Sequence, residues 1–391
     1  MTTPQKVKIS DYCEIASSKR IFASEYLSGG IPFYRGKEIT EKQKSSNAVS
    51  DLIYISKQKF EEIRSKYGAP QQGDLLLTSV GTIGNPYLVK QDEEFYFKDG
   101  NLTWFKNFKN LDSEWLYYWL LSPEGKSELS KSTIGSSQKA YTMQLLSRMR
   151  ITLPDLPTQR KIASVLSAYD DLIENNEKRI KALEEMAQLL YTEWFVKFKF
   201  PGLEKVKMID SGTEFGQIPE DWCVTTFGDS FNVKYGKTLS TSKISKSGEY
   251  KVYGAGGVIG YYDQKNIDTK TALVTCRGNG SGTVWRSFGE GFITNNSFTI
   301  SGRDEGLGFE FIYSCLKGCN IKGSVTGSAQ PQITIEGINF VKFILPPMNL
   351  IKAFLDSTTQ LYSLSDNFLQ RNKNLSETRD LLIPFLMVEN G

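Results

Sequence analysis

The sequence predicts a mixed α/β (α+β) fold built as a tandem repeat, in which two globular parts alternate with two long helices that run antiparallel. Three observations lead to this expectation. The chain has 391 residues, more than one hydrophobic core usually spans, so two or more domains are expected. An internal duplication divides the chain into two copies. Each copy ends in a long segment with helical periodicity.

The duplication appears when GSSQ at 135–138 is aligned with GSAQ at 327–330, which sets an offset of 192 residues. This offset holds without a gap for some fifty residues and pairs many identical residues, among them Thr142/Thr334, Leu153/Leu345, Pro154/Pro346, Leu172/Leu364, Asn175/Asn367, Arg179/Arg371, Leu183/Leu375 and Leu189/Leu381. Upstream the copies correspond with small shifts, as in LLTSVG at 76–81 and LVTCRG at 273–278. The pattern predicts two copies of one architecture.

The globular part of each copy contains short runs rich in β-branched and aromatic residues, bounded by Gly, Asn and Asp, which are typical of strands. We expect strands within 74–80, 94–98, 101–106, 271–276, 291–300 and 340–345, and short buried helices at 113–122 and 309–316. The first copy has extra residues at about 38–70, including a helical segment ended by Gly68.

The two long helices are predicted from apolar residues spaced three and four apart, with charges on the opposite face. The first spans about 158–193, and the second repeats the stripe less strongly until Pro384 ends it. Asn176 and Asn372 fall on the two stripes, where they either fix the register of the pair or face solvent. The residues expected to pair the helices are Ile162, Leu166, Leu172, Ile173, Asn176, Leu183, Leu364, Phe368, Asn372 and Leu375.

The connections require the two helices to run antiparallel if they pair, because the second globular part follows the end of the first helix and precedes the start of the second. The expected segments are a first globular domain at 1–155, a first helix at 156–200, a second globular domain at 201–346 and a second helix at 347–391.

Composition excludes several classes of protein. The chain has no histidine, the commonest general base and a frequent metal ligand. Its five cysteines are scattered without a CxxC pair, and neither a GxGxxG fingerprint before a helix nor a phosphate-binding GxxxxGK[ST] loop is present. We therefore expect no catalytic residue, metal site or cofactor in this chain. No signal peptide or membrane-spanning segment is indicated, which favours a cytoplasmic protein.

The loops between the expected strands have a composition suited to DNA. The net charge of the chain is +3, and the residues that carry the excess lie in the globular parts rather than in the helices. The loops combine glycine with Arg, Lys, Gln and Asn, which can contact phosphates or base edges. For any single glycine, a tight turn between strands is the more common explanation.

The segment LPDLPTQRKIASVLSAYDDLIENNEKRIKALEEMAQLLYTEWFVKFKFPG, at 153–202, resembles the conserved region of the specificity (S) subunits of type I restriction-modification systems. The entry IPEDW at 218–222, the GTIG loop at 81–84 and the GSxQ stretches at 135–138 and 327–330 are similar to the target recognition domains of that family. The second helix departs from the pattern, with Ile351-Lys352 where the first has Gln159-Arg160.

The resemblance implies two target recognition domains that each read half of a bipartite, asymmetric site on double-stranded DNA, with the helices as a spacer. It also implies two modification subunits that bind S-adenosylmethionine and methylate adenine, and restriction subunits that use ATP and Mg²⁺. These cofactors belong to the partners, and the chain itself has no catalytic role. The system is prokaryotic and cytoplasmic, and the free subunit can self-associate through exposed helix faces.

The residues expected to contact DNA are Lys19, Arg20, Tyr34, Arg35, Lys37, Thr82 and Gln138 in the first globular part and Lys237, Tyr253, Arg277, Asn279, Gln330 and Gln332 in the second. Two other functions stay open at this stage. One is a two-headed interaction spacer or decoy that binds modification subunits without reading DNA. The other is an enzyme of a kind that the motifs do not reveal.

Overall fold

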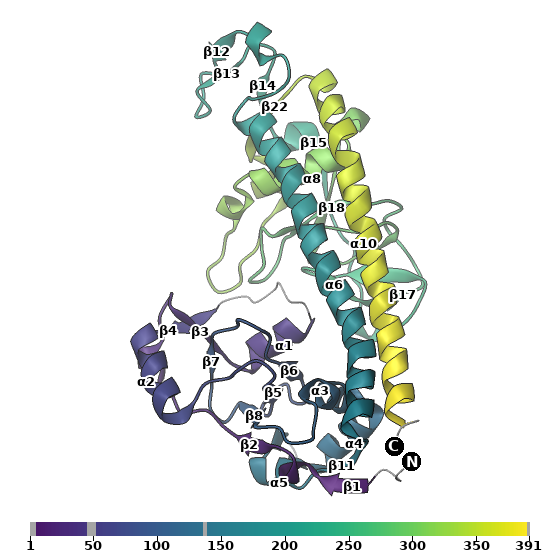
Figure 1. Cartoon of the computed structure of the whole chain (residues 1–391). Coiled ribbons are helices and arrows are strands. Elements are labelled where there is room, and N and C mark those ends of the chain that lie inside the picture. Colours follow the sequence, from purple (N-terminus) through teal and green to yellow (C-terminus); the bar gives the residue numbers. More distant parts are fainter. Residues whose placement is uncertain (1–4, 45–51, 136–138, 389–391) are drawn as a thin grey trace. The chain divides into compact units, whose positions relative to one another are not determined.

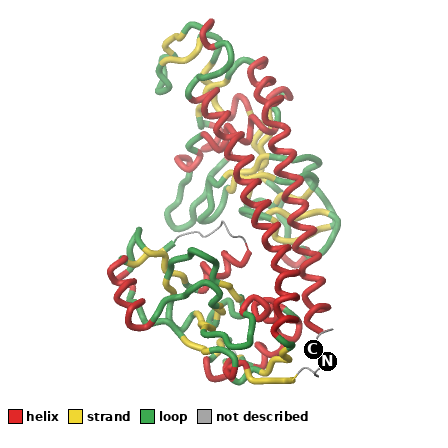
Figure 2. The backbone as a smooth tube through the Cα atoms, in the orientation of Figure 1, coloured by secondary structure: helices red, strands yellow, loops and turns green. Residues whose placement is uncertain are grey.

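The computed structural model describes residues 5–44, 52–135 and 139–388. The chain forms two compact units: unit 1 contains residues 1–177 and 370–391, and unit 2 contains residues 178–369. Each unit consists of short strands, short helices and long loops packed on part of two long helices, α6 (Leu156–Tyr191) and α10 (Met348–Val388) (Figures 1 and 2). This confirms the predicted α+β fold class.

The strands of unit 1 form an antiparallel four-stranded sheet, a mixed three-stranded sheet and two separate pairs. The four-stranded sheet has the order β2 (Glu14–Ala16), β8 (Leu102–Lys106), β5 (Leu75–Thr78), β6 (Pro86–Leu88). The three-stranded sheet has the order β4 (Ile53–Ile55), β3 (Ile31–Tyr34), β7 (Tyr96–Phe97). The pairs are β1 (Gln5–Lys8) with β11 (Arg150–Leu153) and β9 (Thr133–Ile134) with β10 (Ala140–Tyr141).

The helices of unit 1 are α1 (Gly36–Lys44), α2 (Lys57–Tyr67), α3 (Ser113–Leu121), α4 (Pro123–Lys131), α5 (Met143–Ser147) and the first part of α6. Helix α2 is the predicted extra helix, and it ends at Gly68 with φ +82°. Helix α3 is the predicted buried helix, in which Trp115 and Trp119 are almost fully buried. These rings pack with β5, β8 and the first turns of α6 in one hydrophobic core.

Unit 2 repeats the topology of both sheets of unit 1. Its four-stranded sheet has the order β15 (Phe231–Tyr235), β21 (Ser297–Gly302), β18 (Ala272–Thr275), β19 (Val284–Arg286), and its three-stranded sheet has the order β17 (Val258–Tyr262), β16 (Tyr250–Tyr253), β20 (Gly291–Ile293). The pair β14 (Cys223–Thr226) with β22 (Lys342–Leu345) corresponds to β1 with β11. A further pair joins β12 (Met208–Asp210) and β13 (Gln217–Pro219).

The remaining helices of unit 2 are α7 (Phe227–Ser230), α8 (Phe309–Gly318) and α9 (Ile335–Asn339). The 192-residue offset is visible in the structure, because α5, β11 and α6 begin 192 residues before α9, β22 and α10. One identical pair explains part of this correspondence. Thr142 and Thr334 occupy the N-caps of α5 and α9, and their hydroxyls accept hydrogen bonds from the main-chain N–H of Leu145 (3.2 Å) and Gly337 (3.0 Å).

Helices α6 and α10 are antiparallel neighbours in each unit. In unit 1, Asp170 forms an ion pair with Arg379, and the Asn176 side chain donates a 2.7 Å hydrogen bond to the side-chain oxygen of Asn372. Asn372 in turn donates to the main-chain oxygen of Ile173 at 3.2 Å. Asn176 is only 8% exposed. The two asparagines therefore join the helices and fix their register instead of facing solvent.

The residues predicted to pair the helices divide into buried, half-buried and exposed groups. Ile162, Leu166 and Phe368 are buried, while Ile173, Leu183, Asn372 and Leu375 are half-buried. The structure corrects two assignments, because Leu172 is 52% exposed and Leu364 is 45% exposed. Leu172 precedes Ile173, whose main-chain oxygen accepts from Asn372 of the partner helix, and a step of about 100° per residue turns Leu172 away from the seam. Leu364 precedes the buried Ser365, which accepts a hydrogen bond from Arg286 of the sheet.

Pro384 was predicted to end the second helix, and this is wrong. It lies inside α10, which continues to Val388. A proline in a helix removes one main-chain hydrogen bond, but the last turns are held by Ile383 and Met387, which are 4% and 5% exposed in the core of unit 1. None of the helices in the described part of the chain is long and apolar enough to cross a membrane.

Candidate nucleic-acid interface

Three loops of unit 2 meet at one end of its four-stranded sheet, where β15 and β18 end and β21 begins. They are residues 235–241, 275–283 and 325–332. Main-chain contacts join two of them directly, because Gly278 N–H donates to Pro331 O at 2.9 Å and Arg277 forms an isolated bridge with Gln332. The main chain of Lys237 in the third loop is held against the start of β21, where Asn295 N–H donates to its carbonyl oxygen at 3.1 Å.

This surface is basic and has no acidic residue in the three loops. Arg277 and Lys237 are both exposed. The Arg277 guanidinium lies 5.8 Å from the ring centroid of Tyr235, which is itself 41% exposed. Within the described residues, neither cation has a carboxylate partner. Both charges are therefore available to an anionic ligand.

Polar amides lie beside these cations. Asn279, Gln330 and Gln332 are exposed, and each can present one donor and one acceptor to a base edge. The main chain of Gln332 is fixed by hydrogen bonds with Thr326 in both directions, at 2.8 and 2.9 Å. The structure thus brings five of the predicted residues, Lys237, Arg277, Asn279, Gln330 and Gln332, to one surface.

Sequence reasoning missed two members of this surface. Tyr235 was not selected, although an exposed aromatic next to Gly236-Lys237 was a usable signal. Lys322 was not selected either. It lies against Gly282, which has φ +86° and no room for a side chain, since a Cβ there would be 3.0 Å from Lys322 Cγ. Only the folded structure shows that these two segments touch.

The equivalent end of the sheet in unit 1 has the same construction. Ser79 N–H donates to Asn101 O at 2.8 Å, Tyr141 N–H donates to Ser79 O at 2.9 Å, and Val80 forms a bridge with Ala140. A shallow groove at this place is lined by Arg35, Gly36, Lys37, Thr40, Glu41, Val80, Gly81, Thr82 and Asn101. It contains three of the predicted residues, Arg35, Lys37 and Thr82.

Three of the predicted cations of unit 1, Arg20, Arg35 and Lys37, differ from those of unit 2 because they are paired with carboxylates of the same unit. Arg20 forms a 2.8 Å ion pair with Asp99, and Lys37 lies 3.8 Å from a glutamate one turn along α1. Arg35 binds the fully buried Glu38 with its side chain and its main-chain N–H. Burial would raise the pKa of Glu38, but these hydrogen bonds outweigh it and hold the pKa below its usual value. Arg35 thus has a structural role in addition to any contact with a ligand.

Lys19 is exposed beside this region. Its main-chain N–H donates to the Tyr96 hydroxyl at 2.8 Å, and its ammonium lies 5.0 Å from the ring centroid of Tyr67. The position is therefore fixed at the main chain while the side chain remains accessible.

Both tyrosines predicted to contact DNA are buried, and these two assignments are wrong. Tyr34 packs on Phe95 with ring centroids 4.6 Å apart, and Tyr253 accepts a 3.1 Å hydrogen bond from the main-chain N–H of Phe288. Each lies at the end of the central strand of a three-stranded sheet, where alternation turns the side chain inward. Gln138, the remaining predicted residue, lies outside the described residues.

Residues 1–185 and 219–370 match the model of the family described as type I restriction modification DNA specificity domain. The chain belongs to this family. Its two matched segments correspond to the two copies of the duplication and together cover most of the chain.

Curated members of this specificity family are similar over nearly the full length. The type I restriction enzyme MjaIX specificity subunit of Methanocaldococcus jannaschii is 26% identical, with 97% of this chain and 91% of that protein covered. The HindI specificity subunit of Haemophilus influenzae is 22% identical, with 82% and 86% covered. The crystal structure of a type I S subunit from M. genitalium has the same fold, with a TM-score of 0.55 and 16% identity over 98% of this chain and 95% of that one.

Proposed function

We propose that this specificity-family chain is the noncatalytic DNA-reading subunit of a type I restriction-modification complex, and that its two units read the two halves of a bipartite, asymmetric site on double-stranded DNA. The observation that carries the proposal is that one topology presents two different sets of side chains at the same end of the sheet. A protein that read two identical half-sites would have no use for unlike faces.

The difference between the faces is largest at positions suited to base contact. The motif LLTSVG of unit 1 aligns with LVTCRG of unit 2, which places Val80 opposite Arg277 and Thr82 opposite Asn279. Arg reads guanine through two hydrogen bonds, whereas Val and Thr can only contact a thymine methyl group or form a single bond. The two units are therefore expected to prefer different bases.

A shared cation accompanies this difference. The strand registers place Lys19 of unit 1 opposite Lys237 of unit 2, and both are exposed. A lysine in the same place on both faces suits phosphate, which has the same structure in every sequence. Common phosphate contacts and unlike base contacts are what an asymmetric recognition subunit needs.

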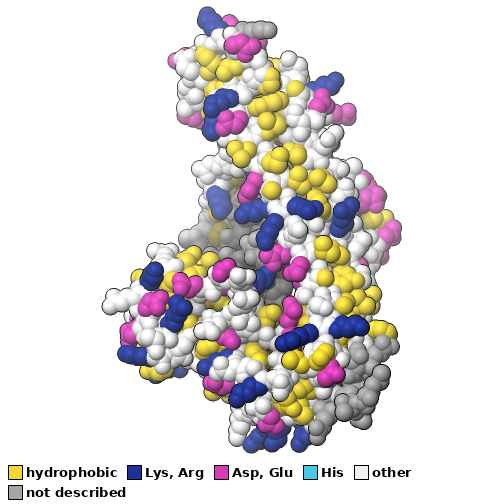
Figure 3. All heavy atoms as spheres, viewed as in Figure 1, with side chains coloured by type: hydrophobic (Ala, Val, Ile, Leu, Met, Phe, Trp, Pro, Cys, Tyr) yellow, Lys and Arg dark blue, Asp and Glu magenta, His cyan; other side chains and the backbone are white. Residues whose placement is uncertain are grey.

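The long helices provide surfaces for partners. Exposed apolar side chains gather along the long helices (Figure 3). Two pairs of exposed leucines on α6 and α10 occupy duplicated positions: Leu172 with Leu364, and Leu189 (59% exposed) with Leu381 (76% exposed). Repeated apolar positions on two helices suit two copies of the same partner. We assign these surfaces to two modification subunits that methylate adenine with S-adenosylmethionine and recruit restriction subunits that use ATP and Mg²⁺.

The test is to express the chain with a modification subunit of the same system and map adenine methylation across the host genome. A new motif with two unlike half-sites and a fixed gap, absent when the modification subunit is expressed alone, is the expected result. Co-purification of the two proteins without a new motif would reject DNA reading. That outcome would favour an interaction spacer or decoy. Turnover of a nucleic acid by the purified chain alone would reject the noncatalytic role.

A further inference from the structure

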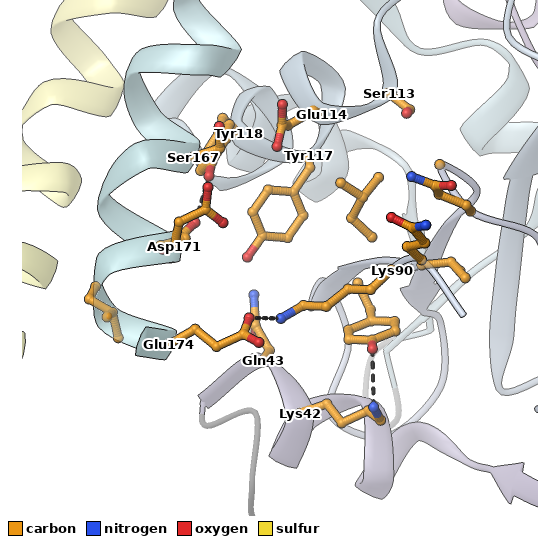
Figure 4. A pocket seen from close by; sticks show the side chains of 18 of the residues that line it. Lys42, Gln43, Lys90, Ser113, Glu114, Tyr117, Tyr118, Ser167, Asp171 and Glu174 are labelled. Carbon is orange, nitrogen blue, oxygen red and sulfur yellow. Dashed lines mark hydrogen bonds and ion pairs between the residues drawn. The ribbon is translucent and has the colours of Figure 1, made fainter. Parts of the chain in front are cut away.

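A cavity of about 550 Å³ lies within unit 1, between the α/β part and the helices α6 and α10 (Figure 4). Its walls combine carboxylates with tyrosine rings. The Tyr117 hydroxyl points into the space, with Glu114 on one side and Asp171 on another, and Lys90 crosses it to form an ion pair with Glu174. A volume of this size fits a small organic molecule.

The internal repeat shows what occupies the same place in unit 2. There Arg286, at the end of β19, is only 3% exposed and reaches Asp366 of α10 and Glu184 of α6, the latter at 2.9 Å. Lys270, just before β18, lies 3.3 Å from both Asp366 and Glu310. In unit 2, two cationic side chains therefore fill the space between the sheet and the helices.

Unit 1 has no cation at either of these positions. The register of β18 with β19 and of β5 with β6 places Leu88 where unit 2 has Arg286, and Gly73 where unit 2 has Lys270. Both residues line the cavity.

Unit 1 nevertheless has carboxylates at the positions that bind these cations in unit 2. Glu114 on α3 corresponds to Glu310 on α8, and the 192-residue offset places Glu174 opposite Asp366. In unit 2 these two positions bind an ammonium group. In unit 1, Lys90 satisfies Glu174, so Glu114 is the position whose cation is missing.

The charges around Glu114 are unbalanced. Among the described residues, neither Glu114 nor the neighbouring Asp171 has a cationic partner, while Asp170 is paired with Arg379. Burial, and then the nearby carboxylates of Asp112, Asp171 and Asp170, raise the pKa of Glu114. A positive group in the cavity would relieve both the burial cost and the repulsion.

We infer that the unit 1 cavity is a binding site for a primary alkylammonium group, held between Glu114 and Asp171 beside the ring of Tyr117. The unit 2 counterpart of Glu114 is Glu310, which lies 3.3 Å from the Lys270 ammonium, and that ammonium lies 4.6 Å from the ring centroid of Phe309. A carboxylate beside an aromatic ring therefore already binds an ammonium group in unit 2. The ammonium can come from a free aliphatic diamine or from a lysine side chain of a partner protein. This inference does not rest on the proposed function.

Titration calorimetry of the full chain with 1,4-diaminobutane tests the inference. Saturable binding with one site is expected, and Glu114→Gln should weaken it about tenfold, the effect of removing one charge-assisted hydrogen bond. Glu61→Gln, a charge change on the exposed face of α2 in the same unit, is the matched control and should leave the affinity unchanged. Leu88→Arg recreates the arginine of unit 2 and should abolish binding while the chain stays folded.

Absence of saturable binding to the wild-type chain, or equal affinity for the wild-type and Glu114→Gln chains, would overturn the inference. The source of the ammonium is decided by repeating the titration on the complex with the modification subunit. Unchanged diamine affinity in the complex identifies a free diamine as the ligand. Competition between the diamine and the partner, together with weaker partner binding by Leu88→Arg, identifies a partner lysine.

Discussion

Replacing Arg286 by methionine tests whether the ion-pair network of unit 2 fastens the sheet to the long helices. The guanidinium donates to Glu184 Oε1 at 2.9 Å and to Ser365 Oγ at 3.0 Å, pairs with Asp366, and lies 5.5 Å from the ring centroid of Tyr362. Methionine keeps most of the side-chain volume but removes the charge, so two carboxylates lose their principal partner.

The size of the effect follows from the burial of each group. Removing one member of a fully buried ion pair costs about 3 to 5 kcal/mol. Here Glu184 and Asp366 are 23% and 31% exposed, and Lys317 and Lys270 lie within 4.0 and 3.3 Å of them, so solvent and these lysines compensate in part. We therefore expect a loss of about 2 to 3 kcal/mol, which lowers the melting temperature of a unit of this size by roughly 4 to 12 °C.

Thermal unfolding combined with hydrogen exchange of peptides from β19 and α8 measures the loss and its location. Faster exchange should be confined to unit 2. Arg303→Met is the matched control, because the side chain of this exposed arginine, among the described residues, donates to the main-chain oxygen of Gly228 and to no carboxylate. A loss at Arg286 no larger than that of the control, or exchange that increases equally in unit 1, would refute the fastening role.

Further predictions concern DNA, register, partners and pH. Arg277→Ala should weaken DNA binding at its half-site by about 1 to 3 kcal/mol in gel-shift titrations in which each half-site is varied. Lys237→Ala should instead weaken binding to all DNA sequences alike and reduce the slope of log affinity against log salt concentration by about 1. An equal loss on every DNA sequence would show that Arg277 contacts phosphate. Asn176→Ala should lower the free energy of unfolding in urea by about 1 to 2 kcal/mol, because the half-buried Asn372 amide loses its donor, and no change would contradict the hydrogen bond. Leu381→Ser should reduce both self-association of the free chain in sedimentation and co-purification of the modification subunit, with unfolding unchanged; unaltered association would place the docking surface elsewhere. Glu114→Gln should stabilise the chain near pH 7 and have no effect near pH 4, since a raised folded-state pKa costs stability only as pH rises through it; a constant difference across that range would contradict this.

The architecture was predictable because the duplication supplies it twice. Each weak signal in one copy was supported by its counterpart, so the strands around Leu76 and Leu273 could be placed. The first long helix was predicted to begin at about residue 158, and α6 begins two residues earlier, at Leu156. Local pattern and repeat offset together determine topology in this chain.

Side-chain direction was predicted less well, for physical reasons. Tyr34 and Tyr253 lie next to loop glycines, so they looked accessible, but strand alternation turns them into the core. Leu172 belongs to an apolar stripe wider than the seam that one partner helix can cover. Pro384 breaks isolated helices, and only the tertiary contacts of its neighbours show why α10 continues. The residue types of the three loops around Arg277 were visible in the sequence, but only the fold shows that these loops meet.

The division of the chain between the two units also constrains the order in which they can be completed during synthesis. Unit 2 is one continuous segment, so every residue of its core is available once residue 369 has left the ribosome. Unit 1 is made first but takes Ile383 and Met387 into its core from the last turns of α10. Unit 1 is therefore translated first but completes its core last. Part of its apolar surface stays exposed until Ile383 and Met387 have been synthesised.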